Sequence, residues 1–446
     1  MAGGNLTGWK RKGFSIDNCI HWLTGTNKRS LLYPIWKDSG VLADDVEIVQ
    51  EEQLFTLEED GKRVSLFNDI DKTVESMIAV SPEDAPECRR FGRNVKRLMG
   101  LDRTGGRHYN RWITPFEFIA LIPGLMKYHG MTVDEYGKCY KSPMLRRFFA
   151  CLTPGNFSAM AFFYVAASFC SGNAALPAGG SLPAAQRMVN KFKELGGRLL
   201  TGKKAVKINL KNNTVTGVEM ADGSVLGADA VISTIDPASF FGKILDVPMP
   251  RGFGKMYSSK EFTRFSALQG AFSSDVSELP FKGTFMVRVP EYARSVFDCE
   301  TIVFREFSHE KTNYPEGKNI VQFMAYTDEE TALSYIKLAE NREEYEAREK
   351  LLAETARRII ADTYPEAAAS LTLLDVWTPA TYKRYTGADM GSFMSFSMPK
   401  KLAPVSLGCK IPKIKNLFVA TQWQTPPGGL PIAAKAGRLA AKALKL

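Results

Sequence analysis

Two hydrophobic patterns follow each other in the first part of this 446-residue chain. The runs Val46–Leu57 and Arg63–Phe67 are predicted to be strands, with Asp60-Gly61 between them as the hairpin turn. An earlier turn and strand are predicted from Lys12 to Leu23. From Thr73 to about Met131, and then to about Cys170, the spacing is helical, with breaks at Pro and Gly. This part therefore predicts a β segment followed by a helical region.

A second ordered unit begins near residue 176. A helix is predicted from Leu182 to Leu195, because apolar residues recur there every three or four positions and Gly196-Gly197 follows. Strands are predicted at Arg198–Leu200, Ala205–Leu210, Thr214–Met220 and Ala228–Ser233. We expect one helix packed on a small sheet.

The next region returns to longer strands and one charged helix. Strands are predicted at Phe262–Phe272, Phe285–Val289, Thr301–Phe307 and Ile320–Tyr326. From Glu343 to Thr363, charged and apolar residues alternate at helical spacing, as in a helix with one solvated face over a core. Pieces of one domain are thus expected to be interleaved with pieces of another.

The chain ends in a strand, a Gly/Pro-rich loop and a helix. The short apolar run Leu417–Ala420 precedes a loop that contains Pro426-Pro427-Gly428-Gly429, and the helix is predicted over residues 432–446 with Pro431 at its first turn. Glycine lets bare backbone approach a ligand, and a helix start offers unpaired N–H groups with partial positive charge. The pattern fits either an ordinary connection or a site for a group that is or becomes anionic.

Composition narrows the class of protein. The seven cysteines are odd in number, scattered and without a Cys-x-x-Cys pair, which argues for reduced thiols and against disulfides or a zinc site. The first residues lack the apolar core of a secretion signal. We therefore expect a cytoplasmic protein that binds no metal.

The net charge of +10 is unevenly placed. Basic residues gather between Arg89 and Arg111, followed by the apolar stretch Trp112–Met126, whereas residues 148–186 contain no charged side chain at all. The cluster fits a solvated face or peripheral contact with an anionic membrane, and no nucleic-acid-binding motif accompanies it. The uncharged span fits a buried helix or the aromatic wall of an apolar substrate cavity. Its candidate lining residues are Phe148, Phe149, Phe157, Phe162, Phe163, Tyr164 and Phe169.

Taken together, these pieces resemble the flavin-dependent amine-oxidase superfamily, and within it the phytoene desaturase, carotenoid isomerase and retinol saturase group. Four stretches carry the resemblance: residues 3–21, which include Gly-Gly-Asn and Asp17 to His21; 176–206, with a double glycine and a helix; 378–387, Thr-Pro-Ala-Thr-Tyr-Lys-Arg-Tyr-Thr-Gly; and 416–437. The resemblance implies a mixed α/β (α+β) fold, in which a Rossmann-like FAD-binding domain is interleaved with a helical and sheet substrate domain.

The printed sequence lacks the dinucleotide-binding unit with which members of this superfamily begin. Such proteins open with a strand, a Gly-x-Gly-x-x-Gly turn and a helix that holds the FAD pyrophosphate. Here the chain starts at the Gly-Gly that should follow this unit, so we expect an N-terminally truncated fold with weakened FAD binding. The predicted domains are 1–70, 175–245 and 410–446 for FAD, 71–174 as a helical region facing substrate or membrane, and 246–409 as the substrate domain.

The resemblance also assigns the site. His21 is the candidate catalytic residue, with a satisfied structural histidine as the alternative. The expected FAD contacts are Gly3, Gly4, Asn5, Thr7, Lys204, Ala205, Val206, Thr234, Asp236, Thr421, Gln422, Gly428, Gly429, Leu430 and Pro431. The resemblance places Gly428 to Pro431 against the flavin ring.

The function that follows is FAD-dependent hydride transfer on a long apolar polyene or isoprenoid-type lipid, by desaturation, saturation or isomerisation. Two alternatives stay open: a non-catalytic or FAD-deficient remnant that binds lipid or membrane, and a flavin amine oxidase. The expected partner is an apolar small molecule, with no nucleic acid.

Overall fold

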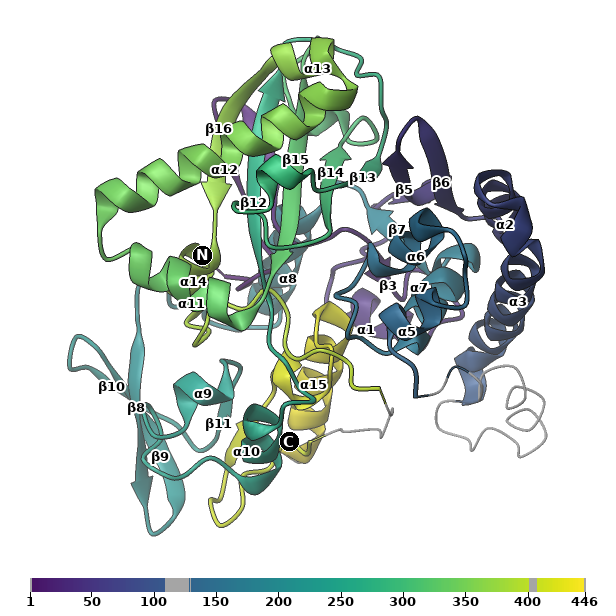
Figure 1. Ribbon diagram of the computed structural model, residues 1–446. Coiled ribbons are helices and arrows are strands. Elements are labelled where there is room, and N and C mark those ends of the chain that lie inside the picture. The colour runs from purple at the N-terminus through teal and green to yellow at the C-terminus, as the bar shows by residue number, and fades with distance from the viewer. Residues whose placement is uncertain (1, 109–127, 129, 401–406, 445–446) are drawn as a thin grey trace.

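The computed structural model describes residues 2–108, 128, 130–400 and 407–444, and its largest sheet has seven strands (Figure 1). In spatial order the strands are β16 (Leu371–Trp377), β12 (Ser266–Ser274), β15 (Asn319–Thr327), β14 (Thr301–Glu306), β13 (Thr284–Arg288), β5 (Gln53–Glu59) and β6 (Lys62–Phe67). β13 and β5 are parallel, and the other neighbours are antiparallel. Every residue of β12 is buried, because layers cover both faces of the sheet.

The two faces of this sheet pack against different layers, since successive strand side chains point to opposite sides. On one face, Leu268 and Phe323 join the core cluster that contains Leu352 of the long helix. Figure 1 shows α12 and α13 along this side. The helices here are α11 (Glu329–Leu338), α12 (Arg342–Thr363) and α13 (Pro365–Ala369). On the other face, Ala267 and Met324 join the cluster that reaches the N-terminal and helical regions.

The helical layer is built around aromatic rings. Its elements are α2 (Ile70–Val80), η1 (Pro82–Asp84), α3 (Ala85–His108), α5 (Val133–Gly137), α6 (Pro143–Ala150) and α7 (Ala159–Cys170). Six of the seven aromatic residues that could have lined a cavity are buried, and Phe148, Phe149 and Phe162 contact one another ring to ring. Only Tyr164 is exposed. This stretch is therefore core: its rings fill the space that a tunnel would need.

The N-terminal region and the segment near residue 175 form a second small unit. It contains the hairpin β1 (Gly8–Arg11) and β2 (Phe14–Asp17), the sheet β3 (Leu23–Thr24), β7 (Ala174–Pro177) and β4 (Ile48–Val49), and the helices α1 (Tyr33–Asp38) and α8 (Ser181–Glu194). Leu6, Trp36 and Ala184 share one core cluster, so α8 packs on this unit. Further short helices are η2 (Glu291–Ala293), η3 (Lys311–Asn313) and α14 (Pro379–Thr386).

The third unit joins the middle of the chain to its end. It comprises the sheet β8 (Ala205–Lys211), β9 (Thr214–Met220) and β10 (Val225–Gly227), the parallel pair β11 (Val231–Ser233) and β17 (Leu417–Val419), and the helices α9 (Pro237–Phe240), α10 (Arg251–Ser258), η4 (Gln422–Gln424) and α15 (Leu430–Ala443). Figure 1 shows α15 on the side of this unit that is nearer to the helical layer.

The predicted mixed α/β class is confirmed, and so are the Asp60-Gly61 hairpin, the helix after residue 180 and the final strand–loop–helix. Three predictions of elements are wrong. Residues 198–200 are not a strand, and Leu199 and Leu200 stay exposed. The strand from Val46 is two short strands, and α8 packs on the N-terminal unit and not on the sheet of 205–220.

The domain boundaries stay a prediction, although β5 and β6 extend the sheet that we assigned to residues 246–409. The apolar stretch Trp112–Met126 lies outside the described residues. Within the described part of the chain, no helix is both long and apolar enough to cross a membrane.

Candidate functional site

The C-terminal loop is held in shape by its own side chains. Gln422 accepts a hydrogen bond at Oε1 from the Gly429 amide at 2.9 Å, and Gln424 accepts one from the Thr421 amide at 2.9 Å. Gly428 has φ +83°, and a Cβ there would lie 2.6 Å from the Ser395 hydroxyl oxygen. Only glycine fits this backbone, because other residues rarely adopt that φ and the space is already filled.

Helix α15 begins directly after this loop. Its N-cap, Gly429, has no side chain to accept from the first-turn amides, and Pro431 follows in the first turn. The first amides of a helix have no partner within it and carry partial positive charge. The predicted residues Gly428, Gly429, Leu430 and Pro431 therefore form one continuous glycine turn and helix start.

A segment that the sequence analysis missed connects this turn to the start of the chain. The Ser395 amide donates to the Pro427 carbonyl at 3.1 Å, and the Asn5 side chain donates to the Phe393 carbonyl at 2.9 Å. Residues 392–395 thus bring Asn5 and the glycine turn into one site. The Gly-Ser-Phe-Met-Ser-Phe-Ser run at 391–397, rich in small polar residues, is the sequence feature that could have identified it.

Three buried polar atoms in this site have no hydrogen-bond partner among the described residues: Asn5 Oδ1, Ser392 Oγ and Ser395 Oγ. A buried polar group without a partner costs about 1–3 kcal/mol, and such groups cluster where a ligand supplies the missing bond. All three belong to the segments that meet beside Gly428. The residues present therefore fit a polar ligand group at the glycine turn.

The first residues form a tight turn at the same place. The Leu6 amide donates to the Gly3 carbonyl at 3.0 Å, Gly3 has φ +116°, and Gly4 has φ +59°. The Asn18 side chain donates to the Asn5 carbonyl, and the Asn18 backbone N–H donates to the Thr7 carbonyl. The predicted contacts Gly3, Gly4, Asn5 and Thr7 therefore lie on one turn next to residues 392–395.

His21 lies on a bend, not on the predicted strand. Its ring centroid is 6.3 Å from that of Phe393, so it belongs to the same site. Burial, and then the nearby Arg305 charge, lower the pKa of His21 to about 3. The imidazole is therefore neutral near pH 7 and can donate one hydrogen bond and accept another.

The other predicted contacts lie in the third unit. Thr234 is exposed, Ala205 starts β8, and Lys204 directly precedes it, with its carbonyl accepting from the Ala221 amide at 2.8 Å. Val206 falls at the register shift between Ala205 and Lys207, so it stands outside the ladder with β9. Its backbone role toward a cofactor stays a prediction.

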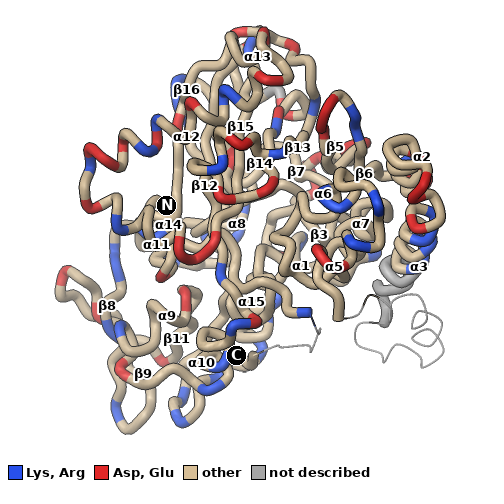
Figure 2. The backbone as a smooth tube through the Cα atoms, viewed as in Figure 1, with Lys and Arg blue, Asp and Glu red and all other residues tan. Residues whose placement is uncertain are grey.

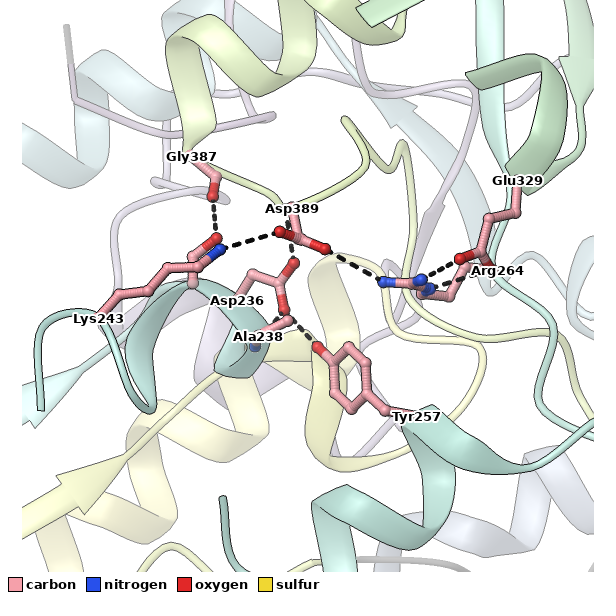
Figure 3. Close-up of polar contacts among 9 residues, drawn as sticks. Asp236, Ala238, Lys243, Tyr257, Arg264, Glu329, Gly387 and Asp389 are labelled. Atoms are coloured by element: carbon pink, nitrogen blue, oxygen red, sulfur yellow. Dashed lines mark hydrogen bonds and ion pairs between the residues drawn. The ribbon is translucent and has the colours of Figure 1, made fainter. Parts of the chain in front are cut away.

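Asp236 sits in a fully paired network (Figure 3). Its carboxylate accepts from the Ala238 amide at 2.9 Å, from the Asp389 amide at 2.8 Å and from the Tyr257 hydroxyl. Burial raises the pKa of Asp236, and these hydrogen bonds oppose the shift. The network continues through Asp389 to Arg264, which also pairs with Glu329. Its contact with FAD stays a prediction.

With this geometry in place, known proteins can be compared. The sequence matches the family described as "Flavin containing amine oxidoreductase" over residues 1–445. The chain belongs to this family. The predicted family and fold class are confirmed, and the family match supports FAD as the cofactor.

Curated relatives are matched over part of their length. Prolycopene isomerases 1 and 2 (chloroplastic) of an Oncidium hybrid cultivar are each 26% identical over 244 residues, which cover 52% of this chain and 39% of theirs. Phytoene desaturase (lycopene-forming) of Paracoccus sp. (strain N81106 / MBIC 01143) is 26% identical over 249 residues, covering 52% and 48%. The match thus spans less than half the length of these relatives.

Solved structures share the fold at low identity. An oxidoreductase from Methanosarcina mazei has a TM-score of 0.57 at 15% identity, covering 100% of this chain and 92% of that one. Putrescine oxidase bound to putrescine has a TM-score of 0.57 at 13% identity, covering 100% and 91%. Cyclohexylamine oxidase from Brevibacterium oxydans IH-35A has 0.55 at 12%, covering 95% and 87%. These likenesses concern the fold alone.

The cofactor fit is good at one end only. The glycine turn, the start of α15 and the three unpaired polar atoms suit the polar edge of a flavin and its ribityl hydroxyls. The printed sequence contains no Gly-x-Gly-x-x-Gly turn for the pyrophosphate. Among the described residues, no group of three metal-ligating side chains is placed to hold a metal ion.

Proposed function

We propose that this chain is a FAD-dependent oxidoreductase that acts on a long apolar polyene or isoprenoid-type lipid. One observation carries the proposal: segment 392–395 joins Asn5 to the positive-φ glycine turn at 428–429, and Asn5, Ser392 and Ser395 each keep a buried polar atom that has no partner within the described chain. The names of the curated relatives, prolycopene isomerase and phytoene desaturase, support the substrate class. The direction of the reaction, whether desaturation, saturation or isomerisation, is left open.

The residues at the turn would hold and tune the cofactor. When bound, the flavin supplies the two-electron hydride chemistry. The Gly428 and Gly429 amides already donate hydrogen bonds within the loop, so the positive end of α15 would be what stabilises negative charge placed against it, by about 0.3–2 kcal/mol. Asn5, Ser392 and Ser395 would pair with the cofactor's polar groups and so recover the cost of burying their unpaired atoms.

His21 would act on the substrate side of the site. With its pKa lowered to about 3 the neutral imidazole is a weak base, so it would act by donating a hydrogen bond from one ring nitrogen and accepting one at the other. Its ring lies edge-on to Phe393, which joins it to the segment at the glycine turn. This catalytic role is part of the proposal, and the alternative is a structural histidine.

Peripheral membrane contact also belongs to the proposal. Arg89, Arg93 and Arg97 recur every four residues along α3, and all three are exposed. Figure 2 shows basic positions along α3 at one edge of the molecule. A basic stripe of this kind favours anionic lipid headgroups. Charge reversal of the three arginines should abolish sedimentation with anionic vesicles, and unchanged sedimentation would contradict this contact.

The test of the function is flavin uptake followed by turnover. The purified chain is incubated with FAD, desalted and examined for visible flavin absorbance; bound flavin is then followed under anaerobic conditions with phytoene, with prolycopene and with putrescine as the amine comparison. We expect reduction of the flavin, or conversion of the lipid, with a polyene only. Reduction by the amine alone would favour the amine oxidase alternative.

The second candidate is a protein that binds lipid or membrane without FAD. A colourless protein that takes up no added FAD, yet binds polyene, would establish this candidate and overturn the first.

A further inference from the structure

A small polar cavity lies on the face of the seven-stranded sheet that packs against the N-terminal and helical regions. Its polar lining consists of Asp17, His21, Gln269, Arg305 and Gln322, and its apolar walls are Val303, Phe307, Phe323 and Met324. The cavity is narrow, so only a small terminal group of a ligand can enter it. Polar side chains at the centre of an otherwise apolar sheet face need a reason, because burying them is costly.

Arg305 is the charged group at this cavity. It is only 4% exposed, yet it makes one hydrogen bond, from Nη1 to the Ile20 carbonyl at 2.8 Å. Its Nε is buried and has no partner among the described residues. The guanidinium lies over the Phe307 ring, with its Cζ atom 4.7 Å from the ring centroid. A guanidinium stays charged in proteins and presents five N–H groups, so most of its donors are unused here.

The other polar groups around the cavity are already engaged. The Asp17 carboxylate accepts from the amides of Cys19, Ile20 and Ser181 and from the Ser181 hydroxyl. Gln322 exchanges two hydrogen bonds with the Asp17 backbone. Glu51 acts on the Arg305 charge from a distance, and neither Asp17 nor Glu51 forms an ion pair with Arg305 within the described residues. The free edge of the guanidinium therefore faces the cavity without an anion.

His21 adds a second donor to the same space. His21 lines the cavity, and its ring makes no hydrogen bond with the described residues. Gln269 donates its amide to the Tyr382 hydroxyl, which fixes the side chain at the cavity wall. A fork of guanidinium donors with an imidazole beside it matches the two oxygens of a carboxylate.

We propose that the Arg305 cavity binds a carboxylate, so that the substrate is an apolar chain with an acid terminus, held by Arg305 and His21. This inference rests on the proposed function, because it names the substrate class for the same site. Arg305 is then a specificity-determining residue. An ester or hydrocarbon of the same length would leave the guanidinium unpaired.

The test compares two ligands that differ only in charge. Parinaric acid, a fluorescent conjugated polyene, and its methyl ester are titrated into the full-length chain in the presence of FAD at pH 7. We expect the acid to bind about tenfold or more tightly than the ester, as for a charge-assisted, two-point contact. Equal affinities for the acid and the ester in the wild-type chain would overturn the inference without any variant.

Variants then locate the contact. In Arg305→Gln the acid should lose its advantage while ester binding stays within about twofold, and Arg305→Lys, which keeps the charge but not the fork, should lie between. Arg358→Gln is the matched control, since Arg358 lies on the exposed face of α12 over the Tyr292 ring. A folded Arg305→Gln that still prefers the acid would contradict the assignment; if it fails to fold, Arg305→Lys and the wild-type comparison decide.

The outcomes separate this inference from the proposed function. Turnover of a polyene hydrocarbon without any preference for the acid would refute the carboxylate site and leave the oxidoreductase intact. A clear preference for the acid in a chain that takes up no FAD would support the site and refute the oxidoreductase.

Discussion

Among the described residues, the network around Asp236 and the glycine turn are both buried polar regions, and they differ in whether the protein itself supplies the hydrogen-bond partners. In the network around Asp236, every acceptor position of the carboxylate that the structure describes meets a donor from the chain. At the glycine turn, Asn5, Ser392 and Ser395 each keep a buried atom without a partner. Buried groups are normally paired, so a self-satisfied cluster stabilises the fold, whereas an unsatisfied cluster is a place for a ligand.

The largest expected effect falls on the satisfied network. Asp236→Ala leaves the amides of Ala238 and Asp389 and the Tyr257 hydroxyl without their acceptor, so it should lower the free energy of unfolding by about 3 kcal/mol or more. Urea denaturation measures this loss. Flavin uptake by the folded fraction should be unchanged. If Asp236→Asn instead lost flavin at wild-type stability, Asp236 would be a cofactor contact and the comparison would fail.

Gly428→Ala tests the other region. The new Cβ would meet the Ser395 hydroxyl at 2.6 Å and would hold a side chain at φ +83°, so strain of about 1–3 kcal/mol and displacement of the turn are expected. FAD affinity, measured by flavin fluorescence, should fall by about tenfold or more.

The control for that change is Gly223→Ala. Gly223 has φ +81° in an exposed turn with nothing within 4 Å of a new Cβ. It carries the same backbone strain away from the site and should leave FAD affinity unchanged. Equal loss of flavin in both variants would mean that strain, and not the site, explains the result.

Acid should act through His21. Its pKa is about 3 in the folded protein against 6.5 unfolded, so the unfolded chain binds more protons below pH 6.5. Stability is therefore full above pH 6.5 and falls as the pH drops from there towards 3. The pKa difference sets an upper limit of about 2 kcal/mol on the stability lost at pH 5. We expect a loss of about 1 kcal/mol, because His21 is only half-buried and solvent screens part of the effect.

Stability curves at several pH values measure this loss. His21→Gln should flatten the profile between pH 7 and pH 5. His309 supplies the comparison, because burial and Arg305 lower its pKa to about 4 as well, so His309→Gln should remove only its own share. A wild-type profile without any slope in this range would contradict the buried, neutral imidazole.

The smallest effect comes from two serines that lie two residues apart. Ser395 has an unpaired buried hydroxyl. The Ser397 hydroxyl, in contrast, accepts hydrogen bonds from the Thr263 amide at 3.0 Å and from the Thr263 hydroxyl at 2.9 Å. Ser395→Ala should leave the stability of the flavin-free protein unchanged or slightly higher and weaken FAD binding about fivefold. Ser397→Ala should cost about 1 kcal/mol of stability and leave FAD binding alone. The reverse pattern would show that Ser395 has no ligand.

Several features of the fold were determined by the sequence alone. The Asp60-Gly61 turn between β5 and β6, the helical spacing of α8 and the Gly/Pro loop before α15 are local patterns, and local sterics and hydrogen bonding decide them. The motif-level resemblance likewise located the glycine turn and the Asn5 turn before any contact was known.

Tertiary structure decided the rest, because it depends on which distant segments meet. Residues 198–200 have a strand-like sequence, but no described strand pairs with them, and a strand exists only through its partner. The aromatic residues of α6 and α7 suited a cavity wall or a core equally well until ring-to-ring packing made them core. Arg305 carries no local mark of function and stands out through burial without partners, whereas Ser395 lies in a run rich in small polar residues but gains its role only from its place beside Gly428.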